Sequence, residues 1–89
     1  MTIDHYSEDV RSEIDLRGRT VDEAVAEVDR TLDGLIVAGG VSLRIVHGKG
    51  TGALRTAIGE HLNLDERVKS FRLGEPNEGG AGVTIAVLD

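Results

Sequence analysis

The alternation of hydrophobic and polar residues predicts a strand followed by a helix in the first half of the chain. Residues 13–17 alternate, with Ile14 and Leu16 on one side and charged side chains on the other, which is the pattern of a strand with one apolar face. Apolar residues then recur at helical spacing over residues 20–38, after a Thr-x-x-Glu capping box. This stripe consists of Val21, Ala24, Val25, Val28, Leu32, Leu35 and Ile36.

The second half of the chain contains the patterns of three further strands and one further helix. An apolar strand covers residues 41–46, and a helix follows over residues 51–62. Residues 68–73 and 83–88 are predicted strands on either side of a glycine-rich loop. The residues of the last strand that we expect to face the helices are Val83, Ile85 and Val87.

The resulting order, β-α-β-α-β-β, predicts a two-layer α/β sandwich. Helical crossovers make the first three strands parallel and place both helices on one face of the sheet. The last strand returns antiparallel, which gives a mixed four-stranded sheet. Residues 13–89 are expected to form this domain, and residues 1–12, which lack periodicity, are interpreted as a flexible N-terminal arm or linker.

Composition and charge restrict the classes of protein and site. The chain has no cysteine, which excludes disulfides and cysteine-ligated zinc. No apolar run approaches the roughly 20 residues that cross a bilayer, and a secretory signal is not evident, so we expect a cytoplasmic protein without a membrane partner. The net charge of −6 disfavours general affinity for nucleic acids, yet residues 40–59 contain three cations and no acid. This basic segment indicates a local anion site, with uneven surface charge as the alternative.

The basic segment contains the glycine-rich sequence His47-Gly48-Lys49-Gly50-Thr51-Gly52, between a predicted strand and a predicted helix. Such a turn at a helix N-terminus offers unpaired N–H groups and a partial positive charge to an anion. His47 adds a proton-transfer group, and Lys49 adds a cation that binds phosphate. Two alternatives stay open: a tight turn that simply requires glycine, and a buried His47 bonded to a carbonyl. The spacing differs from that of a P-loop.

The predicted topology brings the ends of the parallel strands to one edge of the sheet, where ligands bind in open α/β sheets. Asp15, Arg17, His47 and Lys49 then come within reach of one ligand, with Glu75 at the same edge. Asp15 and Arg17 project from the same strand face, so a surface salt bridge is one interpretation. In a site, Asp15 would orient His47, act as a base or bind a divalent cation, and Arg17 would hold a phosphate through two hydrogen bonds.

Two segments at this spacing resemble the motifs of the Smr (small MutS-related) domain. Ile14-Asp15-Leu16-Arg17-Gly18 matches the family's Leu-Asp-Leu-His/Arg-Gly motif, and His47-Gly48-Lys49-Gly50 matches its Thr/His-Gly-x-Gly motif. The resemblance covers about residues 13–88, and Phe71-Arg72-Leu73-Gly74-Glu75 is most similar to the version at the C-terminus of bacterial type-two MutS paralogues. It implies a β-α-β-α-β-β fold related to the C-terminal domain of translation initiation factor three.

The resemblance also implies an activity. Members of the family are associated with endonuclease activity on DNA or RNA, and type-two MutS paralogues with suppression of homologous recombination and with stalled or collided ribosomes. We therefore expect a domain that nicks DNA phosphodiesters, with branched or recombination-intermediate DNA as substrate, fused to a MutS-like ATPase. Many stand-alone members have histidine at the position of Arg17, so this chain keeps His47 as its only motif histidine.

The expected site residues follow from the motifs and from the loop. The resemblance implies that the catalytic residues are Asp15, Arg17, His47 and Lys49. The loop and the first turn of the helix supply the expected nucleic-acid contacts, which are Gly48, Gly50, Thr51, Gly52 and Arg55. We expect no nucleotide cofactor in this domain. A divalent metal, Mg²⁺ or Mn²⁺, is left open, with Asp15, Glu75 and Glu78 as candidate ligands and solvated loop acids as the alternative.

Rival functions and partners also follow from the sequence. The first rival is a module that binds RNA or a ribosomal surface in ribosome rescue with little or no hydrolysis, and the second is RNA cleavage. The scarcity of aromatic residues favours contact by shape over the reading of base sequence. Because edge strands of a small sheet can pair with another copy, a homodimer is an alternative to a monomer.

Overall fold

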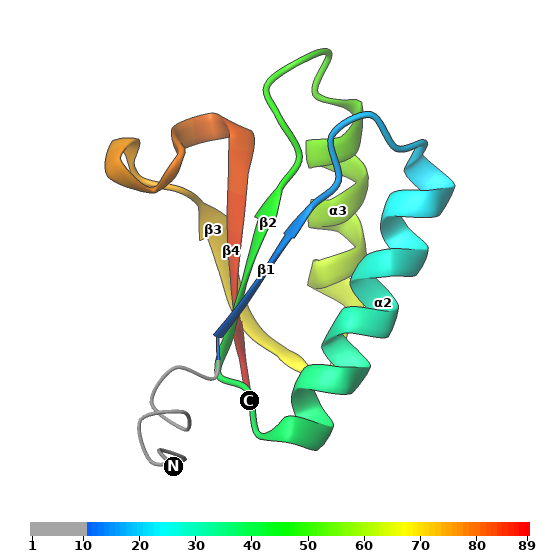
Figure 1. Cartoon of the computed structure of the whole chain (residues 1–89), viewed down its shortest axis with the longest axis vertical. Coiled ribbons are helices and arrows are strands. Elements are labelled where there is room, and N and C mark those ends of the chain that lie inside the picture. Colours follow the sequence, from blue (N-terminus) through cyan, green and yellow to red (C-terminus); the bar gives the residue numbers. More distant parts are fainter. Residues whose placement is uncertain (1–10) are drawn as a thin grey trace, which may run out of the picture.

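The computed structural model describes residues 11–89 and contains a mixed four-stranded sheet with both helices on one face (Figure 1). The elements are β1 (Arg11–Asp15), α2 (Val21–Ala38), β2 (Ser42–Val46), α3 (Ala53–Leu64), β3 (Val68–Leu73), two short 3₁₀ turns (Pro76–Glu78 and Gly80–Gly82) and β4 (Val83–Leu88). This order and the two layers confirm the predicted α/β sandwich. Strand β1 begins earlier than predicted, at Arg11, and the rest of the predicted arm lies outside the described residues.

The strand order in the sheet is β1-β2-β4-β3. Strands β1 and β2 are parallel neighbours, whereas β4 lies between β2 and β3 and is antiparallel to both. The first three strands therefore run in the same direction, as predicted, but β3 is separated from β2 by the last strand. As a consequence, the loops after β1, β2 and β3 all lie at one end of the molecule, at the top of Figure 1.

The core lies between the sheet and the two helices and is entirely aliphatic. Its members are Leu16, Ala24, Val28, Leu32, Leu35, Leu43, Ile45, Ile58, Leu62, Ala86 and Leu88. The capping box opens α2 as predicted, because the Thr20 hydroxyl accepts from the Glu23 N–H (3.2 Å) and the Glu23 carboxylate accepts from the Thr20 N–H (3.0 Å). No helix within residues 11–89 has the length and apolarity that a bilayer crossing demands.

The predicted inward face of β4 is wrong. The register pairs Leu43 with Ala86 and Ile45 with Thr84, so the even-numbered residues of β4 share the helix-facing side of β2. Ile85 and Val87 therefore point to the open face of the sheet. Strand β4 is apolar at nearly every position, and its hydrophobic pattern alone does not distinguish its two faces.

Candidate active site and nucleic-acid interface

The two predicted motifs lie side by side at one end of the sheet. The backbone N–H of Leu16, in the middle of the first motif, donates to the carbonyl of Val46 (2.7 Å), the residue just before the second motif. On the other side, the N–H groups of His47 and Gly48 both donate to the carbonyl of Gly82 (3.0 and 2.9 Å). The glycine-rich loop is thus held between β1 and the start of β4, as the predicted convergence of strand ends requires.

The predicted site residues nevertheless separate into two hollows on opposite faces of the sheet. The helix-side pocket has a volume of about 300 Å³ and is lined by Gly18, Arg19, Val21, His47, Gly48, Gly50, Thr51, Gly52, Ala53, Leu54 and Arg55. The open-face groove has a volume of about 580 Å³ and is lined by Glu13, Asp15, Arg17, Arg44, Val46, Gly48, Lys49, Gly79, Gly82 and Val83. Gly48 lines both hollows, so the loop after β2 lies between them.

Asp15 and Arg17 form a two-pronged ion pair in the open-face groove. Arg17 donates through Nε to Asp15 Oδ1 (3.0 Å) and through Nη2 to Oδ2 (2.7 Å), and its backbone N–H also donates to Oδ1 (3.1 Å). These hydrogen bonds lower the pKa of Asp15 to about 2 and raise the pKa of Arg17. Asp15 is therefore ionised and a weak base at neutral pH, and Arg17 keeps its Nη1 donors for a phosphate while Nε and Nη2 stay bound to Asp15.

Lys49 and two residues that the sequence did not single out for the site complete the charges of the open-face groove. Glu13 and Arg44 are register partners on β1 and β2, and they form an ion pair (2.8 Å). Arg44 also donates through Nη2 to the carbonyl of Glu78 (2.9 Å). Lys49 makes no ion pair with any residue between 11 and 89. Among the cations of this groove, Lys49 is therefore the one whose charge no carboxylate of residues 11–89 offsets.

His47 points to the helix side and is only 5% exposed. Its Nδ1 lies 3.0 Å from the carbonyl oxygen of Gly48, and its Nε2 lies 2.8 Å from Thr84 Oγ1. Because a carbonyl only accepts, Nδ1 carries the proton of the neutral ring and Nε2 accepts from the Thr84 hydroxyl. Thr84, and not Asp15, orients this ring. The environment of His47 is that of the buried-histidine alternative, and its role in proton transfer stays a prediction.

The helix-side pocket is suited to a phosphate. Helix α3 begins at Ala53, and its N-cap residue Gly52 (φ +86°) has no side chain that could cap it. The Thr51 hydroxyl accepts from the Ala53 N–H (3.2 Å), and the first turn contains no acid. The Arg55 guanidinium lies over Gly52, and the positive φ of this position favours glycine. No carboxylate of the described residues lines the pocket. Helix N–H groups and a guanidinium therefore face a space that an anion can occupy.

Two arginines line the helix-side pocket, and they differ in whether a carboxylate already pairs with them. Arg55 makes no ion pair with any residue that the structure describes, whereas Arg19 is paired with Glu27 (3.0 Å). Arg19 was not predicted as a site residue, although its place directly after the first motif puts it at the same sheet edge. Arg55 was predicted from its position one turn into the helix.

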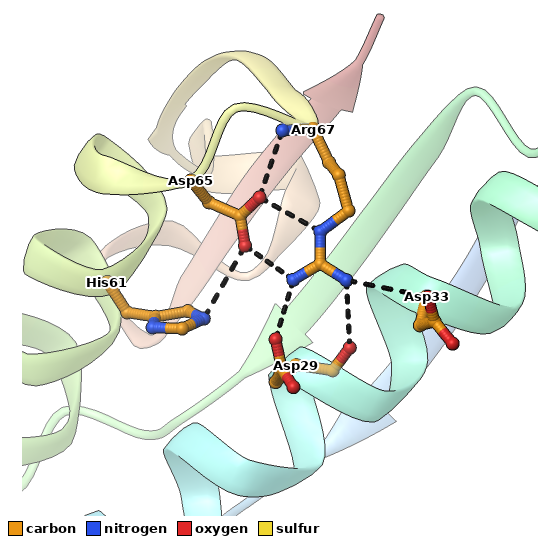
Figure 2. A network of polar contacts seen from close by, with 5 residues as sticks. All are labelled: Asp29, Asp33, His61, Asp65 and Arg67. Atoms are coloured by element: carbon orange, nitrogen blue, oxygen red, sulfur yellow. Dashed lines mark hydrogen bonds and ion pairs between the residues drawn. The ribbon is translucent and has the colours of Figure 1, made fainter.

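The predicted metal ligands Asp15, Glu75 and Glu78 do not converge. Glu78 is held by Arg72 (2.7 Å), and Glu75 lines neither hollow. Within residues 11–89, one group of three His, Asp or Glu side chains has its ligand atoms within 4.8 Å, and it lies at the opposite end of α3. In this group, which comprises Asp29, His61 and Asp65, the guanidinium of Arg67 already lies between the two carboxylates (Figure 2). The carboxylates near the glycine loop are each bound to an arginine, so they do not form a ready-made cation site.

Comparisons with known proteins find similar sequences and similar folds. The model of the Smr domain family matches residues 14–89. An endonuclease MutS2 from Symbiobacterium thermophilum is 57% identical over 76 residues, which are 85% of this chain and 10% of that protein. The chain thus spans about a tenth of the length of the curated relatives that it matches. The crystal structure of the Smr domain of Thermus thermophilus MutS2 superimposes with a TM-score of 0.86 at 54% identity, covering 88% of this chain and 98% of that one.

A second solved structure extends the likeness in fold. YdaL, a stand-alone small MutS-related protein from Escherichia coli, superimposes with a TM-score of 0.80 and covers 85% of this chain and 63% of its own. Its sequence identity is 22%, so this likeness concerns the fold alone.

Proposed function

Because the chain belongs to the Smr domain family, we propose that it is the nuclease domain of a MutS2-type protein and that it nicks DNA phosphodiesters. The relatives that match it carry the name endonuclease MutS2. The observation that carries the proposal is the helix-side pocket, where helix N–H groups, Arg55 and His47 surround a space without carboxylates. The substrate that we propose is branched or recombination-intermediate DNA, and the parent protein is a MutS-like ATPase that suppresses homologous recombination.

The proposed reaction places the scissile phosphate in the helix-side pocket. The N–H groups at the start of α3 and the Arg55 guanidinium stabilise the negative charge that builds up on the phosphoryl oxygens. Within residues 11–89, His47 is the only histidine or carboxylate that lines the pocket, so it is the group that transfers a proton there. In the step, a water oxygen bonds to phosphorus and releases its proton to solvent as the bond from phosphorus to the leaving oxygen breaks. As the acid, His47 works from its doubly protonated form: Nε2–H donates to Thr84, and Nδ1–H turns from the Gly48 carbonyl and passes to the leaving oxygen. Lys49 lies on the other side of the loop, in the open-face groove, and holds a neighbouring phosphate of the same strand.

A cleavage assay with three substrates tests this proposal. The purified domain is incubated with supercoiled plasmid, a labelled DNA junction and labelled RNA, each with and without EDTA. Nicked plasmid or cleaved junction, with intact RNA, is the expected result. Cleavage of RNA alone would contradict the proposal that DNA is the substrate. The reactions with EDTA show whether a divalent metal takes part.

A nucleic-acid-binding module without hydrolysis is the second candidate function. The observation that favours it is the burial of His47, whose two ring nitrogens are both engaged within the protein. Such a module would hold RNA or a ribosomal surface for the parent protein. In the same assay, retarded mobility of RNA with no product from any substrate would support this function over the nuclease.

Replacing Lys49 or Arg55 by alanine is expected to lower the affinity for nucleic acid. It should also make that affinity less sensitive to salt concentration. A cation that contacts a phosphate releases about one counterion, so each substitution should reduce the slope of log K against log salt by about 0.9 for duplex DNA. Fluorescence anisotropy with a labelled duplex at several salt concentrations measures this slope. Arg30→Ala removes the same charge from the outer face of α2 and serves as the control; a slope that changes equally in all three variants would argue against a local phosphate site.

A further inference from the structure

A groove runs between α3 and the edge strand β3, and it consists of two hollows that share Phe71. The first has a volume of about 220 Å³ and is lined by Arg55, Gly59, Phe71, Arg72, Leu73 and Thr84. The second has a volume of about 290 Å³ and is lined by Leu62, Asn63, Val68, Lys69, Ser70 and Phe71. We call the two together the β3 groove.

The ring of Phe71 forms the middle of the β3 groove. Phe71 pairs with Ala86 in the sheet and therefore faces the helix layer, yet it is 36% exposed. Helix α3 presents Gly59 to it, where even a Cβ would come no closer than 3.8 Å to the ring. Leu73, two residues on, is 46% exposed on the same side. An aromatic ring left partly open in this way is a surface on which a nucleobase can stack.

The charges around the β3 groove favour a nucleic acid over an apolar peptide. No acidic residue between 11 and 89 lines either hollow, although the whole chain carries a net charge of −6. Arg55 and Lys69 line the groove, and neither makes an ion pair within the described part of the chain. The guanidinium of Arg72 is held by Glu78 (2.7 and 3.0 Å), so it does not add to this attraction.

The β3 groove is continuous with the helix-side pocket. Arg55 lines both spaces, and Thr84, which lines the groove, is the hydrogen-bond partner of His47 in the pocket. We propose that the groove binds an unpaired nucleobase of the strand whose phosphate occupies the pocket, with the base stacked on Phe71. The inference rests on the proposed function and defines its substrate class as a nucleic acid with an unpaired nucleotide next to the bound phosphate. DNA and RNA share this chemistry, so the experiment includes both.

Phe71→Trp provides a direct reporter, because the chain has no other tryptophan. The probes are oligothymidylate and oligouridylate of about 15 nucleotides, which is close to the upper site size of a single-strand-binding domain. An abasic oligonucleotide of equal length is the control. Stacking predicts that the tryptophan emission is quenched by the oligonucleotides with bases and unchanged by the abasic strand at equal occupancy. Equal quenching by the abasic strand would overturn the stacking site.

Phe71→Leu tests the same site by affinity, since leucine keeps the apolar bulk and lacks the aromatic face. The affinity for the better of the two oligonucleotides should fall by about 5- to 100-fold, while the affinity for a fully paired duplex should stay unchanged. Thermal unfolding of the variant checks the fold. Wild-type affinity of Phe71→Leu for the oligonucleotides would overturn this inference alone. A wild-type domain that binds neither the oligonucleotides nor the duplex would overturn the proposed function as well.

Discussion

Replacing His47 by glutamine is expected to slow the nicking of supercoiled plasmid by about 100-fold or more, the usual contribution of a general acid or base. In the wild type, His47 Nε2 lies 2.8 Å from Thr84 Oγ1. A glutamine amide can keep a hydrogen bond to this hydroxyl, but it cannot transfer a proton. Substitution by alanine would instead leave a cavity and an unpaired buried hydroxyl, so a loss of activity would not be specific. The measurement is the initial rate of conversion to relaxed circles at saturating domain.

The matched control for this prediction is His61→Gln. His61 lies near the C-terminal end of α3, away from the glycine-rich loop, and this substitution should leave the nicking rate unchanged. Both variants should keep the wild-type unfolding temperature and affinity for duplex DNA. If His47→Gln nicks at the wild-type rate, His47 has no part in the chemistry, and its contacts with Gly48 and Thr84 are purely structural.

The elements of the fold were predictable because each has a local signal. The capping box of Thr20 and Glu23, and the helical stripe that follows, depend only on neighbours within a few residues. The position of β4 between β2 and β3 has no such signal, since it is set by pairing between segments far apart in the sequence. The face of β4 was missed for a related reason: inward positions are occupied by residues as small as Ala86, while larger aliphatic residues point outward.

The site was predictable in part. The meeting of the two motifs follows from parallel β1 and β2, and the glycine-rich loop does lie beside the end of β1. Strand alternation could also have predicted that Asp15 and His47 point to opposite faces of the sheet. His47 follows Leu43 and Ile45 at every second position of β2, which face the helices, whereas Asp15 lies at an outward-facing position of β1. Thr84 could not be found in this way, because its contact with His47 depends on the sheet order.

Replacing Arg67 by alanine is expected to lower the free energy of unfolding at neutral pH by about 3 kcal/mol, as happens when one partner of a buried ion pair is removed. Arg67 joins the loop after α3 to α2 (Figure 2): its Nη2 lies 2.6 Å from Asp65 Oδ2 and 2.6 Å from Asp29 Oδ1. The side chain of Asp65 is only 8% exposed, so the variant would leave its charge with His61 Nε2 (3.6 Å) as its remaining neighbour in this cluster. Urea denaturation followed by circular dichroism measures the change.

The pH dependence of this destabilisation distinguishes a charge effect from simple loss of packing. Hydrogen bonds from Arg67 lower the pKa of Asp65 to about 2, from an ordinary value of about 3.9. A carboxyl whose pKa is lower in the folded state stabilises the protein above the ordinary value and loses that contribution as the pH falls through about 2. The difference between wild type and Arg67→Ala should therefore be full at pH 7 and shrink as the pH falls from about 4 towards 2.

The control for the Arg67 prediction is Arg72→Ala, which breaks an equally two-pronged pair with Glu78 on the exposed side of the sheet (2.7 and 3.0 Å). Because water and salt screen that pair, its loss should change stability far less than the loss of Arg67. Equal destabilisation by the two variants would mean that burial of Asp65 does not decide the effect. A difference between wild type and Arg67→Ala that persists undiminished at low pH would assign the effect to the packing of the arginine side chain between α2 and the loop after α3.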